Sequence, residues 1–174
     1  MLGCELLREI NGRVLSGRIV ETEAYDQTDM ASHSFRGITN RNAVMFGPAG
    51  RAYVYFTYGM HYCFNVVTGG EVEGSAVLIR ALEPLAGIEL MAEYRGVKEP
   101  LKLLSGPARL TQALNIDMML NGHDLSRPPL MLKLNPPLDA GSISWSARIG
   151  IKEDKASIKL WRACLRESQY LSRK

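Results

Sequence analysis

The stretch LLREINGRVLSGRIVETEAY, residues 6–25, decides the fold class of this chain. Its two apolar-rich runs, 6–10 and 14–20, flank Asn11-Gly12, the dipeptide that most strongly predicts a tight β-hairpin. The second run continues in an alternating pattern to the end of the stretch, so the second strand is expected to run on that far. The stretch therefore favours a sheet built from antiparallel strands.

Turn residues divide the rest of the chain into further strands and two helices. The expected elements are a long loop over 26–50, two strands within 52–67 that meet at Tyr58-Gly59-Met60, a strand over 75–81, helices over 84–95 and from Gly106-Pro107, an irregular segment over 120–139, and strands over 142–151 and 157–165. We therefore predict an α+β fold in a single domain spanning 1–174. It has a mixed, mainly antiparallel, curved sheet, a few helices and a protruding β-hairpin.

The composition is that of an ordinary globular domain and excludes several classes of protein. The 174 residues are 46% hydrophobic and 22% charged, and no apolar run approaches the length that crosses a bilayer, so no membrane partner is expected. Three widely separated cysteines predict no disulfide framework and favour an intracellular compartment, the cytoplasm, nucleoid or nucleus. The three histidines lack zinc-type spacing, so we expect no metal site and no cofactor.

Charge is distributed unevenly along the chain. Residues 30–70 contain no Asp or Glu but hold all four Phe and four of the seven Tyr, while residues 148–174 carry eight Lys or Arg against three acids. An acid-free aromatic segment and a basic tail suit a polyanion with flat bases, and we expect Lys152 and Lys155 to contact its phosphates. The alternative is a core sheet with a solvated basic face.

Three further places could carry chemistry. Strand alternation puts Glu21, Glu23 and Tyr25 on one face, where a carboxylate beside an aromatic ring could activate water; the alternative is a solvent-facing strand whose glutamates pair with arginines. Arg80 lies in an apolar strand and needs a buried anion, for which Glu23 is the obvious partner. Asn65 lies in another apolar run, so either a ligand or the backbone must satisfy its amide.

The turn Tyr58-Gly59-Met60 is a fourth place. Large side chains at a hairpin tip protrude into solvent unless they enter something, and a wedge between base pairs is one such use for Tyr58 and Met60. The alternative is a hydrophobic strand with tyrosines packed at the rim.

Taken together, these positions resemble one family, the alkyladenine (3-methyladenine) DNA glycosylases. The resemblance is carried by six blocks in matching order: RIVETEAY (18–25), SHSFRG (32–37), RNAVMF (41–46), YVYFTYGMHYCFNV (53–66), LIRALEP (78–84) and LSGPARLTQAL (104–114). It implies an enzyme of base-excision repair that flips a damaged purine out of duplex DNA and hydrolyses its N-glycosidic bond, leaving an abasic site.

The resemblance also implies roles for individual residues in the reaction. Glu23 matches the catalytic carboxylate that acts on the water. Arg80 matches the arginine that helps to hold this carboxylate and the water. Ile149 matches a residue whose backbone carbonyl contacts the water. Residues 1–97 contain no lysine, so no amine is expected in the pocket for a Schiff-base lyase step and the enzyme is expected to be a monofunctional hydrolase.

Base recognition is implied by the same resemblance. Tyr25 matches the ring that stacks on one face of the flipped base, and His33 and Tyr55 match the groups on the other face. Asn65 matches the residue that clashes with the 2-amino group of normal guanine, and Tyr58 matches the side chain that fills the gap in the duplex.

The chain departs from the family pattern at His61, where an aromatic is common, and over 161–173, which match loosely. These departures bear on DNA affinity and stability. We expect a monomer acting on duplex DNA. The alternative is a catalytically inactive module of the same fold that binds damaged DNA or RNA.

Overall fold

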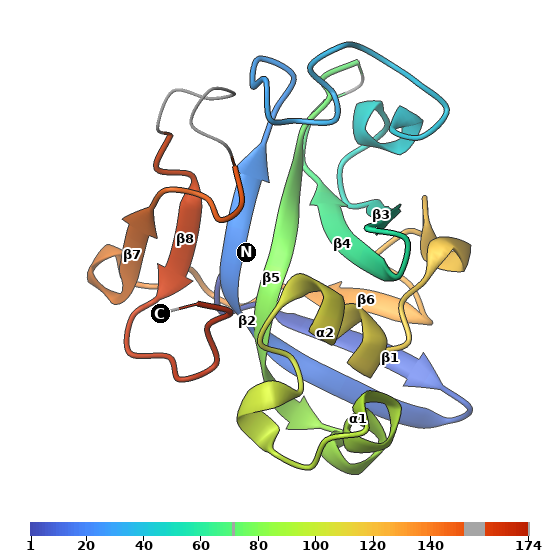
Figure 1. Ribbon diagram of the computed structural model, residues 1–174, viewed down its shortest axis with the longest axis vertical. Coiled ribbons are helices and arrows are strands. Elements are labelled where there is room, and N and C mark those ends of the chain that lie inside the picture. The colour runs from blue at the N-terminus through green and yellow to red at the C-terminus, as the bar shows by residue number, and fades with distance from the viewer. Residues whose placement is uncertain (71, 152–158, 174) are drawn as a thin grey trace.

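A computed structural model describes residues 1–70, 72–151 and 159–173 of the chain. It contains one sheet of eight strands, and two α-helices lie against it near one end (Figure 1). The strands are β1 (Glu5–Ile10), β2 (Arg13–Tyr25), β3 (Ala52–Thr57), β4 (His61–Val67), β5 (Ala76–Ala86), β6 (Leu130–Lys133), β7 (Ile143–Ser146) and β8 (Arg162–Leu165); the helices are α1 (Ile88–Arg95) and α2 (Pro107–Ala113). Short 3-10 turns occur at Ala43–Phe46, Pro100–Lys102, Met118–Leu120 and Ala140–Ser142.

The sheet follows the order β3-β4-β5-β2-β1-β6, with β8 joining β2 and β7 joining β8. All strand pairs among the described residues are antiparallel, and the α+β fold is confirmed. The long strand β2 organises this arrangement because its first half pairs with β1, its second half pairs with β8, and β5 runs along its other edge. The second half of β2, which carries the alternating carboxylates, thus lies between two neighbours.

The pairing of β2 with β5 is irregular at the point where the predicted catalytic residues lie. The register shifts on both sides of Glu21, which leaves Val20 as the extra residue on β2 and Arg80 as the extra residue on β5. A β-bulge bends its strand and re-aims the side chain of the extra residue. This irregularity turns Arg80 toward the two glutamates of β2.

The main hydrophobic core lies between the sheet and the two helices. Strand residues such as Ile19 and Leu82 pack there with Met91 of α1 and Leu110 of α2, all fully buried. A smaller core under the loop over 26–50 contains Met45, Tyr53, Val67 and Ala76.

The loop over 26–50 is held by buried polar side chains. The Asn42 amide donates to the carbonyl oxygens of His33 (2.7 Å) and Gly37 (3.0 Å), and the Ser34 hydroxyl donates to the Gly74 carbonyl (2.6 Å). Such bonds fix a loop without regular secondary structure, because a buried polar group without a partner is costly. The loop can therefore present His33 in a defined position.

Several of the expected elements have different bounds in the structure, and the strand expected over 75–81 runs on to Ala86 as β5. The predicted helix over 84–95 begins only at Ile88, because β5 continues through Pro84. Pro84 opposes Gly17 at a register shift, where the N–H that proline lacks disturbs the hydrogen bonds of the sheet least. The predicted strand over 142–151 ends at Ser146, since the chain then leaves the sheet. The predicted strand over 157–165 is a strand only from Arg162, and residues 157–158 lie outside the described residues.

Two further expectations concern the lysines near the C-terminus and membrane-spanning segments. Lys152 and Lys155, expected to contact phosphates, also lie outside the described residues. In the described part of the chain, no helix is both long and apolar enough to span a membrane.

Candidate active site

A cavity of about 440 Å³ opens on the surface where β2, β3, β4 and β5 meet the loop over 26–50 and the segment 149–151. Seven of the nine residues predicted from the sequence line it: Tyr25, His33, Tyr55, Tyr58, Asn65, Arg80 and Ile149. Tyr53, which was not predicted, also lines it. Glu23 lies directly behind this wall, bonded to three of its residues. Met60 does not line this cavity and instead borders a second hollow beside α2.

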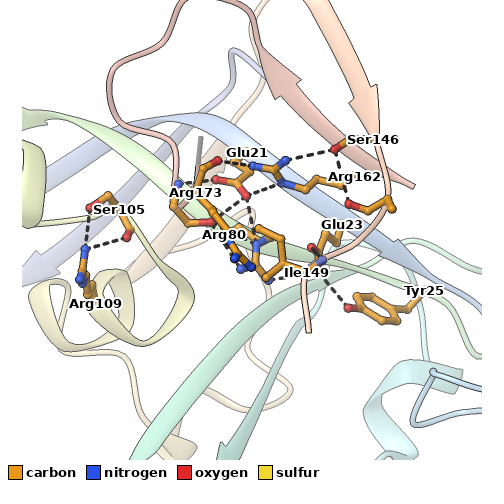
Figure 2. A network of polar contacts seen from close by, with 12 residues as sticks. Glu21, Glu23, Tyr25, Arg80, Ser105, Arg109, Ser146, Ile149, Arg162 and Arg173 are labelled. Carbon is orange, nitrogen blue, oxygen red and sulfur yellow. Dashed lines mark hydrogen bonds and ion pairs between the residues drawn. The ribbon is translucent and has the colours of Figure 1, made fainter. Parts of the chain in front are cut away.

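The Glu23 carboxylate is fully buried and held by three groups (Figure 2). Its Oε1 accepts the backbone N–H of Ile149 at 2.7 Å, and its Oε2 accepts the Tyr25 hydroxyl at 2.9 Å and Nη1 of Arg80 at 3.2 Å. Burial and the adjacent Glu23 raise the pKa of Tyr25, so this hydroxyl stays protonated and donates. Within the described part of the chain Oε1 accepts one bond, so a second acceptor position of this oxygen has no partner there.

Strand alternation in the sequence predicts that Glu21 and Glu23 lie on the same face of β2, and the structure confirms this prediction. Arg80 bonds both carboxylates, through Nε to Glu21 (3.1 Å) and through Nη1 to Glu23 (3.2 Å). The sequence named Glu23 as the partner of Arg80 and left Glu21 aside. Glu21 also binds Arg162 of β8 at 2.8 Å. Because Glu21 and Glu23 are both buried, the alternative of a solvent-facing strand is excluded.

The Tyr25 ring is supported from behind by a second buried ion pair. Arg148 lies over this ring at 4.6 Å from its centroid, donates to the Ala24 carbonyl at 2.9 Å and forms an ion pair with Asp29. Although burial opposes it, the hydrogen bond from Arg148 lowers the pKa of Asp29, so the carboxylate is charged. Because Arg148 precedes Ile149, the same pair fixes both the stacking ring and the N–H that holds Glu23.

The opposite wall of the cavity is an aromatic cluster. The His33 and Tyr55 rings meet edge to face with centroids 4.5 Å apart, and His33 Nδ1 lies 2.9 Å from the hydroxyl of Tyr53. Desolvation, followed by the positive charge of Arg41, lowers the pKa of His33, so its imidazole is neutral at pH 7. Burial raises the pKa of Tyr53 to about 12. This wall is therefore aromatic and uncharged.

The floor of the cavity is formed by side chains of β4. The Asn65 amide donates to the Tyr53 carbonyl at 3.0 Å, which is the backbone alternative that the sequence left open. Burial raises the pKa of Cys63, so the neighbouring thiol is neutral. An amide and a neutral thiol thus form this part of the cavity lining.

The hairpin tip, residues 58–60, projects beside the mouth of this cavity. Tyr58 is 89% exposed and Met60 70% exposed. Tyr58 and Gly59 both have positive φ (51° and 68°), and the Met60 N–H bonds the Thr57 carbonyl, as a tight hairpin turn of the I′ type requires. A tyrosine at positive φ is uncommon, and here the turn points the ring outward rather than into the core.

Four contributors to the site were missed by the sequence analysis. Tyr53 could have been found, since it lies two residues before Tyr55 and therefore shares its face of β3. Arg148, Asp29 and Arg162 gave no local signal, because their ion pairs join parts of the chain that are 119 and 141 residues apart. No cluster of three or more His, Cys, Asp or Glu side chains that could hold a metal ion occurs within residues 1–70, 72–151 and 159–173.

Comparison with known proteins gives a consistent result. The family model described as Methylpurine-DNA glycosylase matches residues 1–169. The chain is 53% identical over 175 residues to a protein of Carboxydothermus hydrogenoformans named "Putative 3-methyladenine DNA glycosylase", a match that covers 100% of this chain and 91% of the relative. Proteins with the same name from Methanoculleus marisnigri (51% identical, 100% and 91% covered) and Nitrosospira multiformis (47% identical, 99% and 86% covered) are also similar.

Proposed function

The chain belongs to the methylpurine-DNA glycosylase family, and we propose that it excises alkylated or deaminated purines from duplex DNA. In this proposal the damaged nucleotide leaves the base stack, its base enters the cavity, and water replaces the base at C1′ of the sugar. The products are the free base and an abasic site.

The observation that carries the proposal is the position of Glu23. This carboxylate is buried behind the wall of an aromatic cavity that opens beside a protruding tyrosine. A carboxylate fixed beside a cavity lined by aromatic rings can deprotonate a water next to a stacked base. The free acceptor position on Oε1 supports this role.

Base selection follows from the walls of the cavity. Tyr25 stacks on one face of the flipped base, while His33 and Tyr55 contact the other face. Such a slot favours flat rings, above all electron-poor alkylated purines, and damaged bases leave the duplex at a lower free-energy cost. Asn65 at the floor excludes the 2-amino group of normal guanine.

The chemistry uses the carboxylate and its arginine. Breaking the glycosidic bond builds positive charge on the sugar, which the Glu23 carboxylate stabilises before taking a proton from the attacking water. Arg80 holds the Glu23 carboxylate in place for both tasks through the ion pair between Nη1 and Oε2. We propose that the backbone carbonyl of Ile149 contacts the attacking water, while the N–H of the same residue bonds the Glu23 carboxylate.

The hairpin tip supplies the wedge. Tyr58 fills the space that the flipped nucleotide leaves in the duplex, and Met60 on the other side of the turn contacts the neighbouring base pair. The exposure of both side chains supports this role, because apolar groups at a tip contribute little to the folded core.

We propose further that the enzyme is a monofunctional hydrolase that acts as a monomer. Among the described residues that line the cavity there is no lysine, and an abasic-site lyase needs an amine nucleophile. Lys152 and Lys155 follow the lining residue Ile151 and lie outside the described residues, so the proposal requires a direct test. Borohydride trapping with abasic DNA should yield no covalent adduct; a trapped adduct contradicts a monofunctional enzyme.

The deciding experiment is a set of duplexes that carry 3-methyladenine, 7-methylguanine, hypoxanthine or ethenoadenine at one position. Wild-type protein in excess should release free base from at least one of them and leave an alkali-labile abasic site. Tight binding to lesion duplexes without any base release would instead identify the inactive binding module.

A further inference from the structure

Four charged side chains form a row of alternating sign from the cavity to the C-terminal segment. This ion-pair row consists of Glu23, Arg80, Glu21 and Arg162, joined by contacts of 3.2, 3.1 and 2.8 Å (Figure 2). Both glutamates are fully buried and both arginines are nearly so. The formal charges of the row cancel, which lowers the free-energy cost of burying four ions.

Glu21 controls the orientation of Arg80. A guanidinium is planar, so the bond from Nε to Glu21 fixes the direction in which Nη1 points, and that direction is toward Glu23. Glu21 itself does not line the cavity. It therefore cannot touch a bound base, and any effect that it has on the reaction passes through Arg80.

The C-terminal segment holds Glu21 in turn. Ser172 donates its backbone N–H to Oε2 of Glu21 at 2.5 Å and its hydroxyl to Oε1 at 2.8 Å. Arg162, whose Nε binds the same Oε1, donates through Nη2 to the Arg173 carbonyl at 2.7 Å. Ser172 thus completes the coordination of a buried carboxylate near the catalytic centre, and Arg173 holds an arginine that binds the same carboxylate.

From these contacts, and on the basis of the proposed function, we infer that Glu21 and Ser172 are positioning residues for Arg80. The C-terminal segment then forms part of the active-site framework. Without Ser172, Glu21 loses two of its four partner groups and Arg80 can turn away from Glu23. A displacement of about 1 Å at a catalytic group can lower a rate about 10²-fold.

The test measures single-turnover base release, lesion-duplex binding and melting temperature for matched variants. Glu21→Gln should release base about 10²-fold more slowly with lesion binding within about threefold of wild type. Ser172→Ala, which keeps the backbone N–H, should be about fivefold slower. Two controls, Glu83→Gln at the partly exposed pair with Arg18 and Ser168→Ala in the same C-terminal segment, should match wild type.

A double-mutant cycle separates positioning from a merely structural role. In an Arg80→Gln background, Glu21→Gln and Ser172→Ala should each lower the rate by less than about twofold, because the residue on which they act is already lost. If the losses multiply instead, or if binding and melting temperature fall in parallel with the rate, the inference is overturned. Ser172→Ala removes one hydroxyl, so it answers the question even if Glu21→Gln does not fold.

The same measurements distinguish this inference from the proposed function. A wild-type protein that releases base, with Glu21→Gln and Ser172→Ala equally active, overturns the positioning role alone. A wild-type protein that releases no base from any lesion overturns the proposed function and the positioning role with it.

Discussion

The buried polar groups behind the cavity and the hairpin tip beside its mouth differ in how their side chains are partnered. Behind the cavity, each of the carboxylates of Glu21, Glu23 and Asp29 has an arginine partner and further hydrogen bonds. At the tip, Tyr58 is almost fully exposed and its ring has no aromatic or cation–π partner within the described chain.

This difference indicates where stability and where affinity should originate. A buried charge is tolerated only when its partners are fixed, so the region behind the cavity must be complete in the free protein. An exposed ring costs the fold little and gains partners only in a complex. Variants behind the cavity should therefore change stability and rate, and variants at the tip should change binding.

The largest effect is expected from breaking the ion pair between Arg148 and Asp29. Arg148→Met leaves a buried carboxylate without its cation and should lower the free energy of unfolding by about 3–5 kcal/mol. Urea denaturation measures this loss. Arg18→Met, at an exposed pair, should cost about 1 kcal/mol or less. Adding Asp29→Asn to Arg148→Met should recover part of the stability; a wild-type value for Arg148→Met would show that the pair contributes little.

Replacing the catalytic carboxylate should separate rate from binding. Glu23→Gln keeps the shape and can still accept the Ile149 N–H, but it cannot take a proton from water. Base release should fall at least about 10²-fold, the lower end for loss of a general base, while binding to lesion duplexes stays within a few-fold. Single-turnover excision with a parallel binding titration measures both. Turnover near the wild-type rate would remove Glu23 from its assigned role.

At the tip the expected effect is on affinity alone. Tyr58→Ser should weaken binding to lesion duplexes by about 1–3 kcal/mol, the scale of one contact between a base and an aromatic ring. The loss should be smaller at a mismatched lesion, because less work remains for unpairing. The melting temperature should not change. A large drop in melting temperature with unaltered binding would make Tyr58 a structural residue.

The smallest effect concerns the dependence of stability on pH. The pKa of Asp29 is lowered in the folded state, so this carboxylate contributes stability that is present above its ordinary pKa, near pH 4, and is lost as the pH falls through the folded value. Asp29→Asn should therefore show a shallower fall in unfolding free energy below about pH 4. Tyr58→Ser should follow the wild-type profile, and an identical profile for Asp29→Asn would exclude this contribution.

Local sequence was sufficient for the features that depend on near neighbours. Asn11-Gly12 predicted the first hairpin because this turn requires residues that accept positive φ, and both have it. Alternation along β2 placed Glu21, Glu23 and Tyr25 on one face because successive strand residues point to opposite sides. The family blocks then named six of the residues that line the cavity, since each block is a local stretch of the chain.

Only the tertiary structure decided how these residues are held. Glu21 meets Arg80, Arg162 and Ser172 across separations of 59, 141 and 151 residues, and Ile149 reaches Glu23 across 126. No local pattern encodes such pairs, because the bulge at Arg80 and the docking of β8 on β2 bring them together only after the sheet has formed. The sequence thus indicated seven of the residues that line the cavity. The packed sheet determined their partners, because a buried charge accepts whichever counter-charge the fold brings within reach.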